Sequence, residues 1–526
     1  MRQPSVMDHS FSRVPNAEIP RSSFDRSHGL KTTFDAGWLI PIFVDEALPG
    51  DTFNLDMTGF ARLATPIFPI MDNMFMETFF FAVPHRLLWT NWEKFCGAQD
   101  DPGDSTDFTI PQMASGGGGF LADTLFDYLG YPTAIGATTT VNALFSRAYN
   151  LIWNEWFRDQ NLQDSAQVDL GDGPDSVGGY PLRRRGKRHD YFTSCLPWPQ
   201  KGVSVQLPMQ GDAPIKGLAV NQADAGTVGT TVKETARGNV SYSANFTDGS
   251  HDIRIEADTT GAAAVPLVFA DLSQVTAATI NQLRQAFQTQ KLLERDARGG
   301  TRYTEVIKAH FGVTSPDMRL QRPEYLGGGS SPVVVSQVPQ TSESATTPQG
   351  TLAAYGTASL HNHGFTKSFT EHCVLLGLVS VRADITYQQG LNRMHSRQTR
   401  FDYYWPALAH IGEQAVLGKE IFMNGNPVND DAVFGYQERF AEYRYKPSQI
   451  TGKFRSNAAG TLDSWHLSQD FASPPVLDDT FIQDNPPVDR VIAVATEPHF
   501  LFDGYFRLRC ARPMPLFGVP GLIDHF

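Results

Sequence analysis

The sequence lacks any cysteine pattern that would indicate a zinc site or a disulfide framework. Its four cysteines, Cys96, Cys195, Cys373 and Cys510, lie far apart in the chain, and no CxxC pair occurs. Because structural zinc sites use cysteines about two to four residues apart, a zinc-binding module is disfavoured. Each cysteine has apolar or aromatic neighbours, which is typical of a buried thiol in a protein made in a reducing cytoplasm.

Long apolar runs are also absent. No apolar stretch approaches the ~18 residues of a membrane-spanning helix, and the N-terminus has no apolar signal core. We therefore expect a chain that is made in the cytoplasm and remains soluble. Catalytic signatures are missing as well, since the sequence contains no GxxxxGKS/T, GxSxG, HExxH or EF-hand pattern. We predict neither enzymatic activity nor a cofactor.

Positive charge is in deficit. The chain has 43 Lys and Arg against 56 Asp and Glu, which gives a formal net charge of −13. Bulk charge therefore argues against a protein that coats nucleic acid unaided, because phosphate binding depends on a local excess of cations. A polyanionic partner would require local basic patches or a separate basic protein.

Strand patterns are present at both ends of the chain. Apolar residues alternate with period two at 34–44 and 53–63, and a Phe-rich run at 75–81 follows before Pro84. The same alternation returns at 373–387 and 500–510. Helical and loop segments lie between these groups. This order predicts a mainly β, antiparallel sandwich with long insertions in its connections.

The remaining segments divide the chain further. Residues 1–29 are polar and turn-rich, which predicts an N-terminal arm, and residues 30–526 form the main domain. A helical stripe occupies 139–161, and a second helix begins at the capping pair Asp271 and Gln274 and ends at Gly299 and Gly300. Residues 200–270 are rich in glycine and poor in large apolar groups, so they predict an exposed insertion without its own core. Residues 326–350 predict a long loop with one short strand at 333–335.

Two basic segments are candidate binding sites. RRRGKR at 183–188 is either a solvated loop or a patch that faces phosphate. At 392–405, NRMHSRQTRFDYYW interleaves arginines with aromatic residues. Cations that follow phosphates and rings that stack on bases suit single-stranded nucleic acid. The alternative is that the rings are core residues and that the arginines pair with neighbouring acids.

Metal sites are weakly indicated. His361 and His363 could form half a site, but no third ligand lies near them in the sequence. Asp169, Asp172 and Asp175 lie in a glycine-rich loop whose spacing does not fit an EF-hand. We therefore predict no metal site.

Several long segments resemble one known family. ITYQQGLNRM (385–394), YWPALAHIGEQAVL (404–417) and FGYQERFAEYRYKPSQITG (434–452) resemble the major capsid protein of gokushoviruses, a branch of the Microviridae. WHLSQDF (465–471) and GLIDHF (521–526) belong to the same resemblance, as do MDNMFMETFFFAVPHRLLW (71–89) and GGTRYTEVIKAHFGVTSPDMRLQRPEYLGG (299–328). The resemblance covers most of 20–200 and 270–526 and thins across 200–270.

The resemblance implies a fold and an assembly. It implies a single eight-stranded antiparallel jelly roll of the viral capsid type, with large helical and loop insertions. Copies would assemble in the host bacterial cytoplasm into a T=1 icosahedral shell, through fivefold, threefold and twofold contacts, around a circular single-stranded DNA genome. The implied partners are a small basic DNA-binding protein and a pilot protein within the virion, and a receptor on the host cell surface.

The resemblance also directs attention to two sets of residues. The arginines expected to face DNA inside the shell are Arg393, Arg397, Arg400, Arg507 and Arg509. The insertion at 200–270 would protrude around a threefold axis and contact the host, unless it is a spacer without a receptor role. Its candidate residues are Gly226, Thr227, Val228, Gly229, Thr230, Thr231 and Val232.

Two other classes of protein remain as alternatives. A β-sandwich glycan-binding surface protein is disfavoured by the absent signal sequence and by cysteines that appear unpaired. An enzyme on a β fold is disfavoured by the lack of any paired acid and base motif. Particle size separates the three classes, because only a shell protein forms megadalton particles.

Overall fold

The structure is a computed structural model that describes residues 20–205, 279–313 and 321–517, and the backbone of short strands between residues 215 and 270. Its contacts divide the chain into two compact units. Unit 1 comprises Met1–Pro199 and Val313–Phe526, and unit 2 comprises Gln200–Gly312. The sequence predicted an insertion at 200–270, and unit 2 extends this region through two further helices.

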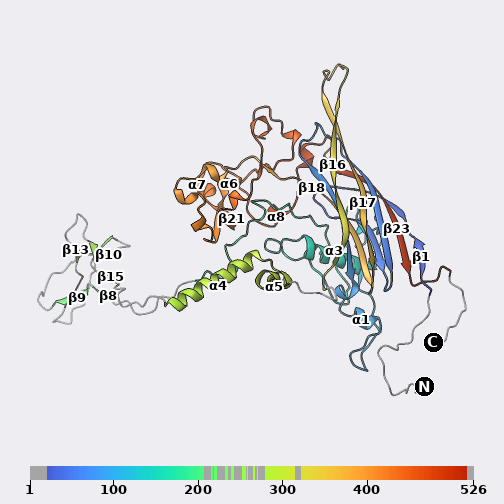
Figure 1. Ribbon diagram of the computed structural model, residues 1–526, viewed down its shortest axis with the longest axis horizontal. Helices are drawn as coiled ribbons and strands as arrows, with labels where there is room; N and C mark the ends of the chain where they lie inside the picture. The colour runs from blue at the N-terminus through green and yellow to red at the C-terminus, as the bar shows by residue number, and fades with distance from the viewer. Residues whose placement is uncertain are drawn as a thin grey trace. The chain divides into compact units, whose positions relative to one another are not determined.

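Unit 1 is built on one nine-stranded antiparallel sheet, which curls over a shared core so that its two halves form facing layers. The first layer has the order β2 (His28–Phe34), β23 (Phe500–Arg512), β4 (Thr52–Leu63) and β17 (Leu352–Ser368). The second layer has the order β3 (Ile40–Ala47), β18 (Cys373–Ala383), β5 (Met74–Pro84) and β16 (Glu324–Pro339). Figure 1 shows strands from both ends of the chain lying side by side. Two packed antiparallel layers of this kind form a jelly roll, which confirms the predicted fold class.

The core between the layers follows from the period of two along each strand. In β4 every second residue is buried, including Phe53, Leu55 and Met57, while most residues between them face solvent. Phe500 and Phe506 of β23 are buried in the same way. One apolar cluster joins these side chains to those of β5 and β18, so the two layers bury one another.

The second layer is buried on both of its faces. Val374, Leu376 and Leu378 of β18 point away from the core between the layers and pack in a separate apolar cluster. Helix α3 (Leu144–Ile152) covers them and contributes both of its terminal residues to that cluster. For this reason β18 is buried at almost every residue, unlike β4.

Two predicted strands are longer than the observed ones. The alternation at 34–44 predicts one strand, but β2 ends at Phe34 and β3 begins at Ile40 in the other layer. The strand predicted at 373–387 ends at Ala383, and Thr386–Tyr387 form the separate strand β19. Turning residues such as Ala36 are buried, so the apolar alternation continues where the chain leaves a layer.

The prediction of a long loop at 326–350 is wrong as far as Pro339, whereas the short strand predicted at 333–335 lies within β16 (Glu324–Pro339). Most of these residues belong to β16, whose first part pairs with β5 as far as Val333 and whose second part pairs with β17 from Val334. Beyond the two layers, β16 and β17 continue as a two-stranded ribbon (Figure 1). β16 therefore forms backbone hydrogen bonds with both layers and connects them.

The glycines of this strand serve close packing rather than flexibility. A Cβ atom at Gly328 would lie 2.0 Å from the carbonyl oxygen of Thr78, and one at Gly327 would lie 2.4 Å from that of Gly364. Neighbouring backbones thus approach where no side chain fits. Because glycine is usually a loop signal, the sequence pattern misdirected the prediction.

The connections of unit 1 carry its remaining elements. Between β5 and unit 2 lie η1 (His85–Leu87), α1 (Trp92–Phe95), β6 (Gln112–Ala114), α2 (Leu125–Tyr128), β7 (Thr140–Asn142), α3, η2 (Trp153–Phe157) and η3 (Val177–Gly179). Between β18 and β23 lie β19, β20 (Glu413–Leu417), α6 (Gly418–Ile421), α7 (Pro427–Asp430), β21 (Val433–Glu438), β22 (Ser448–Gln449) and α8 (Asp479–Ile482). A third apolar cluster, which includes Phe192 and Ile421, joins the two connections. The stripe predicted at 139–161 is thus a shorter helix, α3, continued by the π-helix η2.

The described residues of unit 2 form two helices and short strand pairs. The pairs are β8 (Ile215–Lys216) with β15 (Phe269–Ala270), β9 (Leu218–Asn221) with β12 (Asp252–Ile255), β10 (Thr231–Glu234) with β11 (Gly238–Ser241), and β13 (Ala257–Asp258) with β14 (Val265–Pro266). The helices are α4 (Ile280–Arg298) and α5 (Tyr303–Phe311). A capping box between Thr279 and Gln282 begins α4, whereas the predicted pair at Asp271 and Gln274 lies outside the described residues. Gly299 follows the last residue of α4, which confirms the predicted end.

The first described residues are part of the sheet. Of the segment 1–29 that the sequence assigns to an arm, Ser22–Asp25 form β1, and the last residues begin β2. Both strands pair with β23. Within the part of the chain that the structure describes, no helix is long and apolar enough to cross a membrane.

Candidate nucleic-acid interface

Residues 392–405 are held by short turns with local caps. The turn η5 (Arg393–His395) begins at Asn392, whose side chain accepts a backbone N–H inside the turn. The turn η6 (Arg400–Asp402) follows, and the carboxylate of Asp402 accepts the N–H of Thr399. This hydrogen bond is the main reason why the pKa of Asp402 is lowered. Side-chain caps thus order the segment without a long helix or a strand.

The aromatic rings of the segment lie on the surface. Phe401, Tyr403, Tyr404 and Trp405 are each exposed to about half of their full extent, with relative exposures of 55%, 51%, 49% and 53%. The alternative in which these rings belong to the core is therefore wrong. The guanidinium of Arg400 lies 4.8 Å from the centre of the Phe401 ring. Flat rings and cations thus share one accessible surface, as single-stranded nucleic acid requires.

Two of the three arginines are tied to acids beneath this surface. Arg393 donates through Nη1 to Glu420 Oε1 at 3.0 Å and to the carbonyl of Ala415 at 2.8 Å. Arg397 donates through Nη2 to Glu442 Oε1 at 3.3 Å. The prediction that arginines of the segment pair with neighbouring acids is confirmed for these two. Arg393 anchors the segment to β20 and α6, and Arg397 anchors it to the turn that holds Glu442, whereas Arg400 remains exposed.

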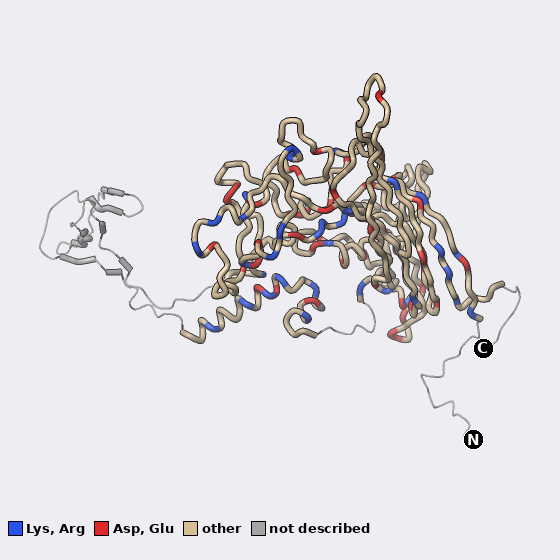
Figure 2. Tube along the Cα trace, turned by 45° about the horizontal axis from the view of Figure 1, so that its top comes forward, with Lys and Arg blue, Asp and Glu red and all other residues tan. Residues whose placement is uncertain are grey.

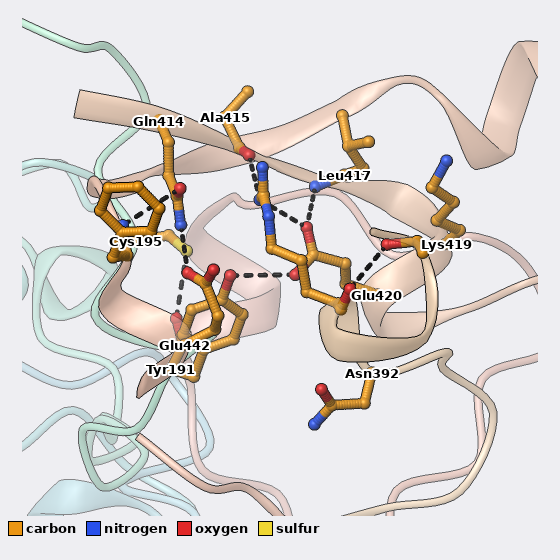
Figure 3. A network of polar contacts seen from close by, with 12 residues as sticks. Tyr191, Cys195, Asn392, Gln414, Ala415, Leu417, Lys419, Glu420 and Glu442 are labelled. Atoms are coloured by element: carbon orange, nitrogen blue, oxygen red, sulfur yellow. Dashed lines mark hydrogen bonds and ion pairs between the residues drawn. The ribbon is translucent and has the colours of Figure 1, made fainter. Parts of the chain in front are cut away.

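The acids belong to a wider polar network (Figure 3). Glu420 also accepts the Tyr191 hydroxyl at 2.9 Å, and Glu442 accepts the Gln414 amide at 2.7 Å. Burial raises the pKa of the Glu420 carboxyl, although the guanidinium of Arg393 opposes this change. Residues from both long connections therefore meet in one bonded cluster, which gives the surface above it a rigid base.

Arg507 and Arg509 lie elsewhere. Both are on β23, at positions that point away from the core between the layers, and Arg507 donates to Asp56 at 2.7 Å. Figure 1 shows β23 and α6 on opposite sides of the sandwich in unit 1. The five predicted arginines consequently do not form a single surface. Figure 2 shows Lys and Arg mixed with Asp and Glu along the described part of unit 1.

The predicted receptor residues have no described side chains. Gly226 to Thr230 lie outside the described residues. Thr231 and Val232 begin the backbone of β10, opposite Ser241 and Val240 of β11. Their role stays a prediction.

Neither prediction for RRRGKR at 183–188 is correct, because its side chains are packed between elements of unit 1. Five of its cations each lie over an aromatic ring within 4.2–4.6 Å of the ring centre. The pairs are Arg183 with Trp153, Arg184 with Trp38, Arg185 with Phe79, Lys187 with Phe481 and Arg188 with Phe75. Residues 183–188 therefore pack against the sheet, and they form neither a solvated loop nor a phosphate site. We call this segment the strap.

Buried acids accompany this strap. Glu77 of β5 pairs with Arg185 and, at 3.0 Å, with Arg382 of β18. Burial raises the pKa of Asp484 to about 7 and lowers the pKa of Lys187 to about 8. The cations of the strap thus lie among buried acids of the second layer and of the second long connection. These opposite charges compensate one another and hold the three parts together.

The histidine and aspartate candidates for metal binding have partners within the chain. His363 is buried, with Nδ1 2.8 Å from Thr78 Oγ1 and Nε2 3.1 Å from Ser331 Oγ. Asp175 accepts two hydrogen bonds from Arg147, and Asp172 accepts the indole N–H of Trp89. Across the described ranges, no three His, Cys, Asp or Glu side chains form a group that could hold a metal ion.

The sequence prediction named only one of the two segments that form the aromatic surface. The guanidinium of Arg397 lies 4.4 Å from the ring centre of Tyr443, and the ring of Tyr404 meets that of Phe440 edge-on at 5.4 Å. Tyr443 and Tyr445 are 52% and 42% exposed. The sequence signal was present, because arginine and tyrosine alternate in EYRYK (442–446) as they do in the first segment.

Comparison with known proteins decides the family. The profile of the family described as capsid protein (F protein) matches residues 12–522. The chain belongs to this phage capsid protein family. The resemblance to the capsid proteins of the Microviridae is thereby confirmed. As a phage major capsid protein, the chain is a structural component of the virion and assembles with copies of itself into a shell.

Three relatives match over nearly their whole length. Capsid protein VP1 of Bdellovibrio phage phiMH2K is 48% identical over 98% of each chain. Capsid protein VP1 of Chlamydia phage 1 is 44% identical over 99% of this chain and 98% of its own. Capsid protein VP1 of Spiroplasma virus 4 is 38% identical over 98% of this chain and 97% of its own. All three relatives are named as capsid proteins, which are structural proteins.

Proposed function

We propose that this capsid protein forms a closed T=1 icosahedral shell around a circular single-stranded DNA genome. Its partners are copies of itself at the fivefold, threefold and twofold axes, a small basic DNA-binding protein and a pilot protein. Assembly takes place in the host bacterial cytoplasm. The acidic net charge of −13 supports a division of labour, in which a separate basic protein neutralises most of the genome.

The observation that carries DNA contact is the exposed surface of rings and arginines at 392–405 and 439–446. Arg400 is exposed beside Phe401, and the rings of Tyr403 and Trp405 are half exposed. Such rings stack on unpaired bases, and the cations between them pair with phosphates. Arg393 and Arg397 act as positioning residues in this proposal, because their ion pairs hold the surface in place.

Replacing Arg400 with Gln is expected to weaken DNA contact. Loss of one phosphate contact reduces the slope of log K against log salt by about 0.7 for a single strand. Oligonucleotide binding by the unassembled full-length chain measures this slope, and the ratio of absorbance at 260 and 280 nm measures packaged DNA per particle. We expect both the slope and the DNA content to fall in the variant.

Arg507→Gln is the matched comparison, since Arg507 is also exposed but lies on the opposite side of the sandwich. Normal packaging by Arg400→Gln together with reduced packaging by Arg507→Gln would assign the genome to the outer face of β23. Unchanged packaging in both variants would contradict a role for either arginine.

A second part of the proposal concerns host attachment. The composition of residues 200–270, with many glycines and few aromatic residues, supports an outward protrusion that contacts a cell-surface receptor. Contacts between copies around a threefold axis would steady it.

Removing residues 212–258 and closing the gap with a short Gly/Ser link is expected to abolish attachment to cells without preventing assembly. Electron microscopy checks assembly, and cosedimentation with host cells checks attachment. Normal attachment would eliminate the receptor role. A failure to assemble would show that the segment belongs to the shell itself.

A further inference from the structure

A pocket opens beside the polar network in unit 1. It lies between the two long connections, and its cavity volume is about 50 Å³. Aromatic side chains from three places line it, namely Tyr191 and Phe192, Tyr387, and Tyr445. Amide and hydroxyl groups complete the lining with Gln388, Asn392, Ser448 and Gln449. The pocket therefore combines flat apolar faces with groups that donate and accept hydrogen bonds.

The backbone around the pocket is fixed. β19 and β22 pair in parallel, with Tyr387 opposite Gln449, so two lining residues lie on one short ladder. Gly390 lets the chain pass directly against α6, because a Cβ atom there would lie 1.9 Å from the carbonyl oxygen of Glu420. The N–H of Leu391 donates to the carbonyl of Lys419 at 2.8 Å. A pocket with such walls needs little rearrangement to receive a ligand.

The charges of the pocket compensate one another. Glu420 is paired with Arg393, and Glu442 is paired with Arg397. An anionic ligand would be repelled by the two carboxylates. A cationic ligand would gain little, because both carboxylates already pair with arginines. The pocket consequently suits a neutral, flat, polar ligand. Asn392, which Figure 3 shows with its amide away from the network, and the exposed Gln449 can bond to the edge of such a ring.

The mouth of the pocket is continuous with the surface of rings and arginines. Tyr445 is 42% exposed, and its ring centre lies 6.4 Å from that of the buried Tyr191. Lys446 is exposed and stands between Tyr445 and Pro447, both of which line the pocket. Arg397 holds Glu442 of the lining and also lies over the ring of Tyr443 outside it. A stacking ring thus lies at the opening, and an exposed lysine follows it in the chain.

We propose that this pocket binds one unpaired nucleobase of single-stranded DNA, stacked on Tyr445, while Lys446 pairs with the adjoining phosphate. The inference rests on the proposed contact with the genome and adds a defined site to it. Any base can stack on an aromatic side chain. The base would enter the neutral pocket, while its phosphate would stay outside and pair with the lysine. Contact would then depend on bases as well as on charge.

The experiment compares two strands of equal charge. Fluorescence anisotropy measures binding of the unassembled full-length chain to a thymidine oligonucleotide of about ten nucleotides and to an abasic strand of the same length. We expect Tyr445→Ala to weaken binding of the thymidine strand about tenfold and to leave the abasic strand unaffected. Tyr355→Ala is the matched control, because Tyr355 is also an exposed tyrosine (53%, against 42% for Tyr445) and lies on β17.

Further variants separate the contributions of ring and charge. Tyr445→Phe keeps the ring and is expected to bind the thymidine strand like the wild type, which excludes a general loss of structure. Lys446→Gln is expected to weaken both strands alike and to lower the salt slope by about 0.7.

Three results would overturn the proposal. If Tyr445→Ala binds both strands like the wild type, the pocket holds no base, although DNA contact through the surface still stands. If the wild type binds neither strand, the proposed DNA contact fails together with the pocket. If a neutral oligosaccharide displaces the thymidine strand from the wild type but not from Tyr445→Ala, the ligand of the pocket is a sugar rather than a nucleobase.

Discussion

Replacing Gly328 with Ala is expected to destabilise unit 1 strongly. The added Cβ atom would lie 2.0 Å from the carbonyl oxygen of Thr78 and 2.9 Å from its carbonyl carbon. These atoms belong to the backbone of β5, which is held by β16 on one side and β18 on the other. The clash can be relieved only by separating the two strands, so we expect a loss of roughly 3 kcal/mol or more in the free energy of unfolding. The yield of soluble chain and of particles measures the effect.

Two variants make this result specific. Gly29→Ala places the same methyl group on a strand of the first layer, 3.7 Å from the nearest atom of the chain, and is expected to be neutral or slightly stabilising. Thr78→Gly combined with Gly328→Ala removes the threonine side chain but not the carbonyl, so no rescue is expected. Normal particles from Gly328→Ala would contradict the close approach of β5 and β16.

The strands that alternate were predictable because one of their faces is buried. β4 and β23 show this pattern most clearly, and both were located within a few residues. Apart from the short strand predicted at 333–335, β16 was missed because its consecutive glycines fill a tight space between β5 and β17, where the physical reason for glycine depends on neighbours distant in sequence. No local pattern distinguishes such a glycine from one in a loop.

The candidate site shows the same limit. The interleaving of arginines and rings at 392–405 was visible in the sequence, but which arginines are free for a ligand depends on Glu420 and Glu442, which lie far along the chain. The run at 183–188 was misjudged for a related reason. Its cations are acceptable inside unit 1 because rings and acids from β5, η2 and α8 surround them, and sequence spacing does not reveal that arrangement.

The second large effect is expected at Arg147. Its side chain is 0% exposed and donates through Nε and Nη2 to Asp175 at 2.8 and 2.6 Å, while Nη1 donates to the carbonyl groups of Leu88 and Gly171. One guanidinium on α3 thus fixes the end of η1 and the loop at 171–175. Arg147→Met fits a similar volume but leaves the Asp175 carboxylate buried without its cation.

We expect Arg147→Met to lower the free energy of unfolding by about 3 to 5 kcal/mol, which is the usual loss when one partner of a buried ion pair is removed. Thermal unfolding of the full-length chain measures this loss. Asp175→Asn in the same chain removes the stranded charge, so the double variant is expected to recover part of the stability. This recovery distinguishes the stranded charge from lost packing.

Arg507→Met provides the matched control for burial. Arg507 forms an ion pair of 2.7 Å with Asp56, yet its side chain is 67% exposed, against 0% for Arg147. Water screens an exposed pair and competes for both partners, so this variant is expected to cost less than about 1 kcal/mol. Equal losses for Arg147→Met and Arg507→Met would contradict the argument, because the two pairs differ in burial far more than in length. A large loss confined to Arg147→Met would identify the buried guanidinium as the support that holds α3 to the end of η1 and to the loop at 171–175.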